Sequence, residues 1–369
     1  MLIPRSVHPL PGEHERATRL LGLLDACAGR RVVILGDLIA DEFIYGRVAR
    51  VSREAPVLIL QYDSTEVVPG GAGNAANNVA ALGGRARLVG LAGRDEPGRR
   101  LVAALRGRMD LTGLVRPAGY RTPVKTRILA GGIHSAKQQV VRIDRVGSSD
   151  VDAGLRAAVG PKALAALAAC DAVLVSDYGS GLVTPDLVAK LRAHLRARAR
   201  RREVPILVDS RYDLLRYRGA TACTPNESEV EQLFGVRIND NGRVLERAGR
   251  AMLKRMRSNA VLVTRGSRGM ALFEPDRPTV HIPIFGSDEV ADVTGAGDTV
   301  IATMTLALAA GASFYEAARL ANYAGGIVVM KRGTATVTPA ELREAITADH
   351  AAPPEPWSQE GPPQGRTTG

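Results

Sequence analysis

The segment Asp292-Val293-Thr294-Gly295-Ala296-Gly297-Asp298 has the residue types of an anion site beside a base. An apolar stretch, residues 299–308, follows it and predicts a helix. The three small residues at 295–297 would let backbone N–H groups converge at the N-terminus of that helix, where the partial positive charge favours phosphate. Asp298 would lie in the first turn, where its carboxylate would repel a phosphate unless it served as the base for an incoming hydroxyl. The alternative is an aspartate that simply caps a helix after a glycine turn.

A second glycine-rich segment, Pro69-Gly70-Gly71-Ala72-Gly73-Asn74, leads into a stretch with helical periodicity. Consecutive glycines let a ligand approach the backbone closely, and Asn74 can both donate to and accept from a polyhydroxylated ligand such as a sugar. Dinucleotide binding is the competing hypothesis, because residues 71–76 match G-x-G-x-x-A. However, residues 63–69 do not have the pattern of the buried strand that this motif requires. The G-x-x-x-x-G-K-[ST] motif of P-loop kinases does not occur either.

The chain is strongly basic, with a formal net charge of +11 and a pI near 10.0. The densest basic run, residues 192–202, has no interleaved aromatic side chains that could stack on bases. We therefore interpret it as a solvated helix end and expect no nucleic-acid partner. A basic protein does suit an anionic, phosphorylated small-molecule substrate.

The three cysteines, at positions 27, 170 and 223, are far apart and form no C-x-x-C pair. This spacing indicates neither a disulfide framework nor a zinc site. The sequence shows no signal-peptide pattern and no apolar run of 18 residues. We therefore expect a cytoplasmic protein without a membrane partner.

The positions of apolar residues predict one α/β unit over residues 30–349, preceded by an N-terminal extension (1–29) with one amphipathic helix and followed by a disordered tail (350–369). Short apolar runs alternate with segments of helical periodicity, which favours a doubly wound, mostly parallel sheet. The expected strands cover residues 32–35, 87–91, 172–175, 206–208 and 261–263, and the expected helices include residues 75–82, 97–105, 185–200 and 242–256.

Two stretches, within residues 43–62 and 122–144, have extended patterns but no crossover helix of their own. They predict a small second β-sheet that covers the substrate as a lid. The alternative is an antiparallel edge of the main sheet. A lid with exposed strand edges also predicts a homodimer, because such edges are often buried by pairing.

Three motifs occur in a fixed order, namely Gly70-Gly71, Asn226-x-x-Glu229 and Asp292-x-Thr294-Gly295-Ala296-Gly297-Asp298. Together they resemble the ribokinase-like (PfkB) carbohydrate kinases, over about residues 30–345. Within the family the likeness is greatest to the D-glycero-β-D-manno-heptose 7-phosphate kinases. The segments that carry this likeness are Gly36-Asp37-x-x-x-Asp41, residues 50–57, Gln138-Gln139-x-x-Arg142-x-Asp144, Ser176-Asp177-Tyr178 and Thr224-Pro225-Asn226-x-x-Glu229.

The resemblance implies a ribokinase-like fold and a role for each matching residue. Asp298 would take the proton of the sugar hydroxyl, while the N–H groups of Gly295, Ala296 and Gly297 hold the transferring phosphoryl group. Asn226 and Glu229 would position Mg²⁺ and the nucleotide phosphates, unless they are only a polar helix start. The turn with Thr264, Gly266 and Gly269 would bind the nucleotide, unless it is a plain left-handed turn, and Asn322 would lie near the adenine.

The sugar side of the site is implied in the same way. Asp41 would grip sugar hydroxyls, with Asp37, Gly70, Gly71 and Asn74 in the same pocket. The candidates for a distal phosphate of the substrate are Arg50, Arg53, Arg142 and Arg211. Some relatives also hold a monovalent cation, K⁺, through the backbone at positions that correspond to Asp292 and Thr294.

The implied reaction is transfer of a phosphoryl group from ATP, with Mg²⁺, to the anomeric O1 of a heptose 7-phosphate, which gives the 1,7-bisphosphate. Two departures affect the substrate prediction. The heptose kinases have Asp-Tyr-x-Lys-Gly and Asp-Pro-Lys where this chain has residues 177–181 (Asp-Tyr-Gly-Ser-Gly) and 209–211 (Asp-Ser-Arg), which changes the cations available to a phosphate. The alternatives are another PfkB sugar or sugar-phosphate kinase, a non-catalytic sugar sensor on the same fold and, last, a dehydrogenase.

Overall fold

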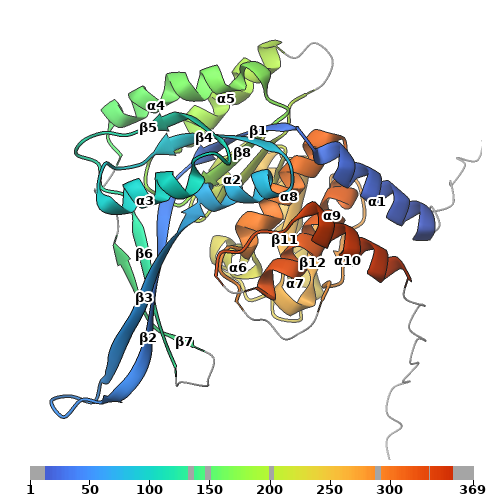
Figure 1. The fold of residues 1–369 in the computed structure, drawn as a ribbon. Coiled ribbons are helices and arrows are strands. Elements are labelled where there is room, and N and C mark those ends of the chain that lie inside the picture. Colours follow the sequence, from blue (N-terminus) through green and yellow to red (C-terminus); the bar gives the residue numbers. More distant parts are fainter. Residues whose placement is uncertain are drawn as a thin grey trace, which may run out of the picture.

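A mostly parallel sheet runs through the centre of the computed structural model, which describes residues 13–131, 137–145, 151–198, 203–286, 292–331 and 333–351 (Figure 1). Its strands are β1 (Arg31–Gly36), β4 (Arg85–Leu91), β5 (Asp110–Val115), β8 (Ala172–Asp177), β9 (Ile206–Ser210), β10 (Ala222–Cys223), β11 (Ala260–Thr264), β12 (Met270–Phe273) and β13 (Val280–Ile282). They are ordered β13-β12-β11-β10-β9-β8-β1-β4-β5. Only the β11–β12 and β12–β13 pairs of this sheet are antiparallel. The predicted α/β fold is confirmed.

Helices cover both faces of the sheet. One face carries α1 (Glu13–Cys27), α2 (Ala72–Ala81), α3 (Glu96–Leu105), α8 (Ala296–Ala310), α9 (Phe314–Val329) and α10 (Pro339–Ala351); the other carries α4 (Ala153–Ala166), α5 (Pro185–Arg198), α6 (Glu227–Phe234) and α7 (Gly242–Met256). Short 3₁₀ helices are η1 (Leu167–Ala169), η2 (Leu214–Arg216) and η3 (Gly266–Arg268). Along β1, Val32 and Ile34 enter one core and Val33 and Leu35 the other, because side chains alternate across a strand.

The two central glycine motifs each end in a buried helix. Helix α8 is buried along nearly its whole length, from Asp298 to Ala309, because it is apolar on all sides. Helix α2 begins at Ala72, three residues before the predicted stretch, so Asn74 lies in its first turn rather than in a loop. The predicted strands and the other predicted helices are present, with shifts of no more than two residues at their ends.

Both predicted flanking segments contribute to the folded unit. Leu20, Leu23 and Leu24 of α1 belong to the same core as residues of α8, α9 and α10. Helix α10 runs to Ala351, so it extends two residues into the segment that was expected to be a tail. Residues 1–12 and 352–369 lie outside the described part of the chain.

A separate four-stranded sheet stands off the main one. It consists of β2 (Leu38–Val51), β3 (Leu58–Gly71), β6 (Val124–Gly131) and β7 (Gln138–Arg145), in the order β3-β2-β6-β7. The predicted lid sheet is confirmed, and the alternative of an edge of the main sheet is wrong. The β2–β3 hairpin reaches far from the body of the molecule (Figure 1).

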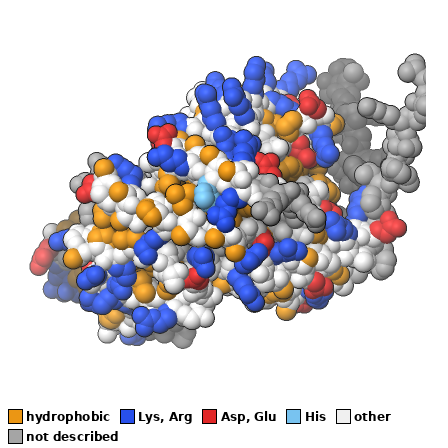
Figure 2. Space-filling model, turned by 90° about the horizontal axis from the view of Figure 1, so that it is seen from above, with side chains coloured by type: hydrophobic (Ala, Val, Ile, Leu, Met, Phe, Trp, Pro, Cys, Tyr) orange, Lys and Arg blue, Asp and Glu red, His pale blue; other side chains and the backbone are white. Residues whose placement is uncertain are grey.

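Lys and Arg side chains are spread over several parts of the face seen in Figure 2, between apolar and neutral groups. Among the described helices, none combines the length and the apolar character needed to cross a membrane.

Candidate active site

The N-terminus of α8 presents Asp298 to a cleft. Gly295 is the N-cap, with φ 78°, and Asp298 lies in the first turn with 5% of its surface exposed. A Cβ on Gly295 would lie 2.5 Å from Nδ2 of Asn74, so both the backbone conformation and the packing require glycine there. A Cβ on Gly297, in contrast, would meet no atom of the described residues within 4 Å. The turn is therefore tightly packed at Gly295, against Asn74, and open at Gly297, on the side of the cleft.

Two side chains donate to the carboxylate of Asp298. Asn74 Nδ2 donates to Oδ2 at 2.9 Å, and the hydroxyl of Tyr178 donates to Oδ1 at 3.1 Å. Burial raises the pKa of Asp298 to about 7, although these two hydrogen bonds and nearby Lys125 lower it. A carboxyl group with this pKa can accept a proton near neutral pH.

Asn74 was predicted to bind a sugar, but its side chain instead donates to Asp298. Its side chain is fully buried, and its Oδ1 accepts from Nδ2 of Asn78 at 3.2 Å. Its amide nitrogen also lies 3.5 Å from the carbonyl oxygen of Gly295. Because its polar atoms already have partners in the protein, Asn74 fixes the orientation of the carboxylate.

Asp37 likewise holds a loop. Its carboxylate accepts from the backbone N–H groups of Tyr178 (2.8 Å) and Ser180 (3.2 Å) and from the Ser180 hydroxyl (2.5 Å). Burial raises the pKa of Asp37, and these hydrogen bonds lower it. Asp37 was predicted to lie in the sugar pocket with Asp41, but both of its carboxylate oxygens accept hydrogen bonds from the loop that carries Tyr178.

The same loop is held from its other side by Asp177. This carboxylate accepts from Tyr217 Oη (2.6 Å), Ser210 Oγ (2.8 Å) and the N–H group of Gly179 (3.0 Å). Tyr178, which was named only as part of a motif, is thus fixed by two buried aspartates. Its ring position was not foreseeable from its spacing in the sequence.

Asp41 belongs to β2 of the lid sheet, where the predicted sugar pocket would be. Arg127 Nη1 donates to Asp41 Oδ1 at 2.6 Å, and the two side chains are only 11% and 7% exposed. A Cβ on Gly70 would lie 2.1 Å from Asp41 Oδ2, and one on Gly71 would lie 3.4 Å from the ring of Tyr178. The structure therefore brings Asp41 and the two glycines together beside Tyr178.

Strand β6 supplies two basic residues that the sequence analysis missed, Lys125 and Arg127. They are two positions apart and so point to the same face of the strand. Lys125 Nζ lies 4.8 Å from the centre of the Tyr178 ring. Burial lowers the pKa of Lys125, and so do the neighbouring charges of Arg211 and Arg142. The sequence did contain a signal for these two residues, because they are two positions apart within a stretch that was predicted to be a lid strand.

Two of the four predicted phosphate-binding arginines are close to this cluster and two are not. Arg211 lines the cleft, and Arg142 lies opposite Arg127 in the β6–β7 ladder, where it pairs with Asp144. Arg50 and Arg53 are exposed at the far end of the β2–β3 hairpin. Arg50 lies nine residues beyond Asp41 in the same strand and is therefore about 30 Å from it. Within one chain, Arg50 and Arg53 thus cannot bind a phosphate of a sugar held at Asp41, and the prediction for these two arginines is wrong.

A cleft of about 480 Å³ opens on the other side of Asp298. It lies at the carboxyl ends of β8, β9 and β11, the edge where α/β sheets bind ligands. The predicted residues that line it are Arg211, Asn226, Glu229, Thr264, Gly266, Gly269, Gly295, Ala296, Gly297, Asp298 and Asn322. Asn322 is anchored there through Nδ2, which donates to the carbonyl oxygen of Pro283 at 2.8 Å.

Asn226 and Glu229 form a capping box at the start of α6. The Asn226 side chain accepts from the N–H group of Glu229, and the Glu229 carboxylate accepts from that of Asn226, both at 2.9 Å. The polar helix start that was the alternative for this motif is therefore present. Both residues nevertheless line the cleft, and burial raises the pKa of Glu229.

Asp209, at the end of β9, is a further cleft residue that was not predicted. Burial raises its pKa, and the nearby carboxylates of Glu229, Asp298 and Asp177 raise it further. Within the described residues, no three His, Cys, Asp or Glu side chains form a group that could hold a metal on their own. A Mg²⁺ ion bound through one or two carboxylates, waters and substrate phosphates would fit this set and relieve its repulsion.

The segment before the α8 turn folds onto the loop after α9. Asp292 accepts from the N–H groups of Thr294 (2.9 Å) and Gly333 (3.0 Å). The buried hydroxyl of Thr334 has no hydrogen-bond partner among the described residues. Asp292 and Thr294 are the positions for which a monovalent cation was considered.

The sequence matches the family described as pfkB family carbohydrate kinase over residues 30–341. The chain belongs to the pfkB family of carbohydrate kinases. It is therefore a phosphotransferase that acts on a sugar, and the family predicted from the three motifs is confirmed. The dehydrogenase alternative has no support.

This pfkB kinase is similar to proteins named bifunctional protein HldE. It is 42% identical to that of Geobacter metallireducens over 321 residues, which are 86% of this chain and 63% of the relative. It is 43% identical to that of Caulobacter vibrioides over 338 residues, 89% of this chain and 66% of the relative. The chain thus spans less than two thirds of the length of these relatives.

The fold of this pfkB kinase also occurs in solved structures. Phosphofructokinase-2 from Escherichia coli in complex with potassium aligns with a TM-score of 0.70 at 17% identity, over 88% of this chain and all of that chain. Ribokinase from Arabidopsis thaliana, complexed with ribose and ATP, aligns with a TM-score of 0.65 at 19% identity, over 88% of this chain and all of that chain. At these identities the likeness establishes a shared fold.

Proposed function

We propose that this chain transfers the γ-phosphoryl group of ATP to the anomeric O1 of D-glycero-D-manno-heptose 7-phosphate. The observation that carries the proposal is the position of Asp298. It stands between the nucleotide-sized cleft on one side and, on the other, the lid residues Asp41 and Lys125, with a pKa of about 7.

In the proposed reaction, the Asp298 carboxylate takes the proton of the sugar hydroxyl as its oxygen attacks the γ-phosphorus. The new O–P bond forms while the bond to the bridging oxygen of ADP breaks. The N–H groups at the start of α8, which converge behind Gly295, would stabilise the charge on the transferring phosphoryl group. Asp298 then releases its proton to solvent, and the product is the 1,7-bisphosphate.

Asp209 and Glu229, together with Asn226, are the residues that we propose to hold Mg²⁺ through water molecules. The ion would neutralise the charge of the nucleotide phosphates. For K⁺, the loop around Asp292, Thr294 and Thr334 is the proposed place, supported by the Thr334 hydroxyl, which has no hydrogen-bond partner in the described part of the chain.

The proposed phosphorylated substrate rests on the basic cluster under the lid. Lys125, Arg127, Arg142 and Arg211 gather there, where a neutral sugar would need few cations. Arg142 and Arg127 also have acidic partners, so Lys125 and Arg211 are the better candidates for the distal phosphate.

Another sugar phosphate is the second candidate substrate, because residue 180 differs from that of the heptose kinases. The heptose kinases have a lysine there, and Ser180 instead donates to Asp37 and leaves the site without that cation. A non-catalytic sugar sensor is less well supported, because Asp298 keeps the geometry and the pKa of a base.

An ADP-release assay across heptose 7-phosphate, fructose 6-phosphate, ribose and adenosine would test the proposal. We expect turnover with heptose 7-phosphate, and phosphorus NMR of the product should show a glycosyl phosphate at O1. Turnover of only an unphosphorylated sugar would contradict the substrate assignment, and sugar binding without ADP release would favour the sensor.

A further inference from the structure

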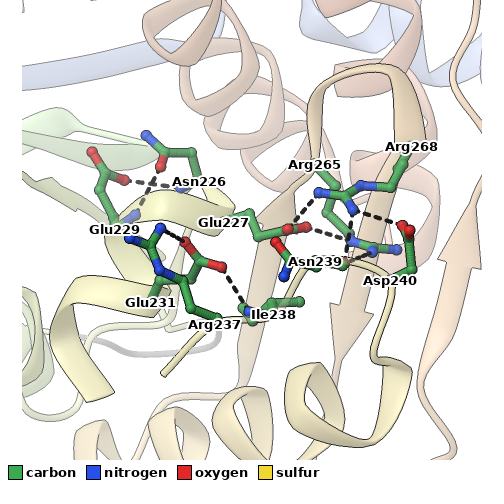
Figure 3. A network of polar contacts seen from close by, with 10 residues as sticks. All are labelled: Asn226, Glu227, Glu229, Glu231, Arg237, Ile238, Asn239, Asp240, Arg265 and Arg268. Carbon is green, nitrogen blue, oxygen red and sulfur yellow. Dashed lines mark hydrogen bonds and ion pairs between the residues drawn. The ribbon is translucent and has the colours of Figure 1, made fainter. Parts of the chain in front are cut away.

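Glu227, the first residue of α6, points away from the phosphate end of the cleft and toward the turn between β11 and β12 (Figure 3). Its Oε2 accepts from Arg265 Nε at 2.9 Å, and its Oε1 accepts from Nη2 of Arg268. Arg268 also donates to the carbonyl oxygen of Asn239 (2.7 Å) and to Asp240 (2.9 Å). One carboxylate thus binds two arginines that are three residues apart.

These two arginines bracket the turn that forms one wall of the cleft. Gly266, Ser267 and Gly269 line the cleft, whereas Glu227 does not. The turn closes on itself through Arg265 N–H to the Gly269 carbonyl (2.8 Å) and Gly269 N–H to the Gly266 carbonyl (3.0 Å). Among the described residues, chain neighbours aside, no atom lies within 4 Å of a Cβ placed on Gly266, so none of their side chains packs against that point of the turn.

The contact of Glu227 with Arg265 is sheltered from solvent. Their side chains are 11% and 12% exposed, so this pair is screened much less than a surface ion pair. The hydrogen bonds are also charge-assisted and therefore stronger than neutral ones. Loss of the Glu227 charge would leave the largely buried Arg265 side chain without this anionic partner and would free the turn to move.

We propose that Glu227 is a positioning residue for the nucleotide, which it serves by holding the Arg265–Gly269 turn at its place in the cleft wall. The proposal rests on the proposed function, because it assumes that this wall contacts ATP. It gives the two glutamates at the start of α6 separate roles, with Glu229 in the cleft at the phosphates and Glu227 behind the wall. It also predicts that changes at Glu227 affect ATP and not the sugar.

The variants E227Q and R268Q test this role. E227Q keeps the size of the side chain and one acceptor oxygen but removes the charge. R268Q changes a partly exposed residue and leaves the Glu227–Arg265 pair, so it tests the proposal even if E227Q folds poorly. The matched control is E231Q, on the next turn of α6, where Glu231 accepts from the N–H group of Ile238 and pairs with Arg237 (Figure 3).

The measurement is calorimetric titration with the magnesium complex of a non-hydrolysable ATP analogue, alongside thermal unfolding and titration with heptose 7-phosphate. We expect E227Q and R268Q each to weaken analogue binding about tenfold, the effect of one lost charged hydrogen bond. The double variant should be little worse than either single one, because the two residues act as a unit. Sugar-phosphate affinity should stay within about twofold, and E231Q should bind as the wild type does.

Each other outcome contradicts the proposal in a recognisable way. If E227Q and R268Q fold and bind the ATP analogue with wild-type affinity, the role proposed for Glu227 is wrong, while the proposed function stands. An equal loss for the sugar phosphate, or the same loss in E231Q, would show a general structural effect and overturn that role as well. A wild-type protein that does not bind the analogue would overturn the proposed function together with this inference.

Discussion

Asp298 combines the two properties that a proton acceptor needs, a place on the cleft surface and a pKa close to neutral pH. We expect D298N to bind the ATP analogue as the wild type does and to lose about 10³-fold in kcat, because the amide cannot take a proton. Steady-state kinetics and analogue titration check both parts. The matched control is D186N, an exposed first-turn aspartate of α5, and retained turnover in D298N would remove the role assigned to it.

The pH dependence of the reaction should report the same carboxyl group. Below pH 7 Asp298 is mostly protonated and cannot act, so kcat/KM should rise with pH and level off above about 7. The hydrogen bond from Tyr178 lowers the pKa of Asp298, so Y178F should move the rising limb to higher pH. The exposed Tyr62 provides the control Y62F. A limb that stays in place, or moves to lower pH, would contradict this assignment.

At the scale of residues, the sequence predicted which residue types form the site better than it predicted their hydrogen-bond partners. The small residues around Asp298 indicate an anion hole by chemistry alone. That Asn74 would donate to Asp298, 224 positions away, depends on how α2 packs against α8, which no local pattern contains. The polar residues Asn74 and Asp37 were therefore placed correctly near the site but given a ligand in place of a protein partner.

The start of α8 shows how an element constrains its residues. We expect G295A to lower the free energy of unfolding by about 1–3 kcal/mol, because alanine is strained at φ 78° and its Cβ would displace Asn74. G297A is the matched control, since its Cβ meets nothing and alanine favours a helix by up to about 1 kcal/mol. Urea unfolding of both variants distinguishes them, and equal stabilities would contradict the packing described for Gly295.

Strand β6 should determine whether the enzyme prefers a phosphorylated substrate, through the side chain of Lys125. We expect K125Q to raise the KM of heptose 7-phosphate about tenfold or more, and to leave the KM of ATP nearly unchanged, because it removes a charge that faces the distal phosphate. The assay belongs above pH 8, since Lys125 also lowers the pKa of Asp298. R47Q, which breaks a lid ion pair with Asp63, is the control. An unchanged KM for K125Q would place the phosphate elsewhere.

At the scale of elements, strand and helix periodicity was sufficient for the main sheet, and the missing crossover helices were sufficient for the lid. The lengths of β2 and β3 were not predicted, because their outer halves have few buried residues and hence no clear alternation. This is why Arg50 and Arg53 were assigned to the pocket. Their motif was recognised, but its distance along the hairpin could only come from the register.

The whole molecule places the cleft and the lid residues on either side of the Asp298 carboxylate. The lid contributes Asp41 and Lys125 from one sheet, and the carboxyl ends of the other sheet contribute the cleft. A lid carried on long strands can close over a substrate without moving Asp298, because α8 is fixed in the core. The sequence could not show this arrangement, because it depends on how two sheets meet.

The lid also leaves apolar side chains in solvent, and a second copy of the chain would cover them. The exposed ones are Val48, Val51, Val57, Leu58 and Tyr62 on the hairpin and Val140, Val141 and Ile143 on β7. Both β3 and β7 are edge strands of the lid sheet, so among the described residues their outer edges have no neighbouring strand. These features support the predicted homodimer.

Light scattering should therefore give a mass about twice the 39.1 kDa of one chain, because pairing of two lids removes apolar surface and strand edges from water. The double variant V51K/L58K puts charges on the hairpin and should shift the protein toward monomers with little change in stability, since both side chains are already exposed in a single chain. M330K, an exposed apolar position outside the lid, should remain dimeric. A monomeric wild type, or a dimer that M330K disrupts and V51K/L58K does not, would show that the exposed apolar side chains of the lid serve another purpose.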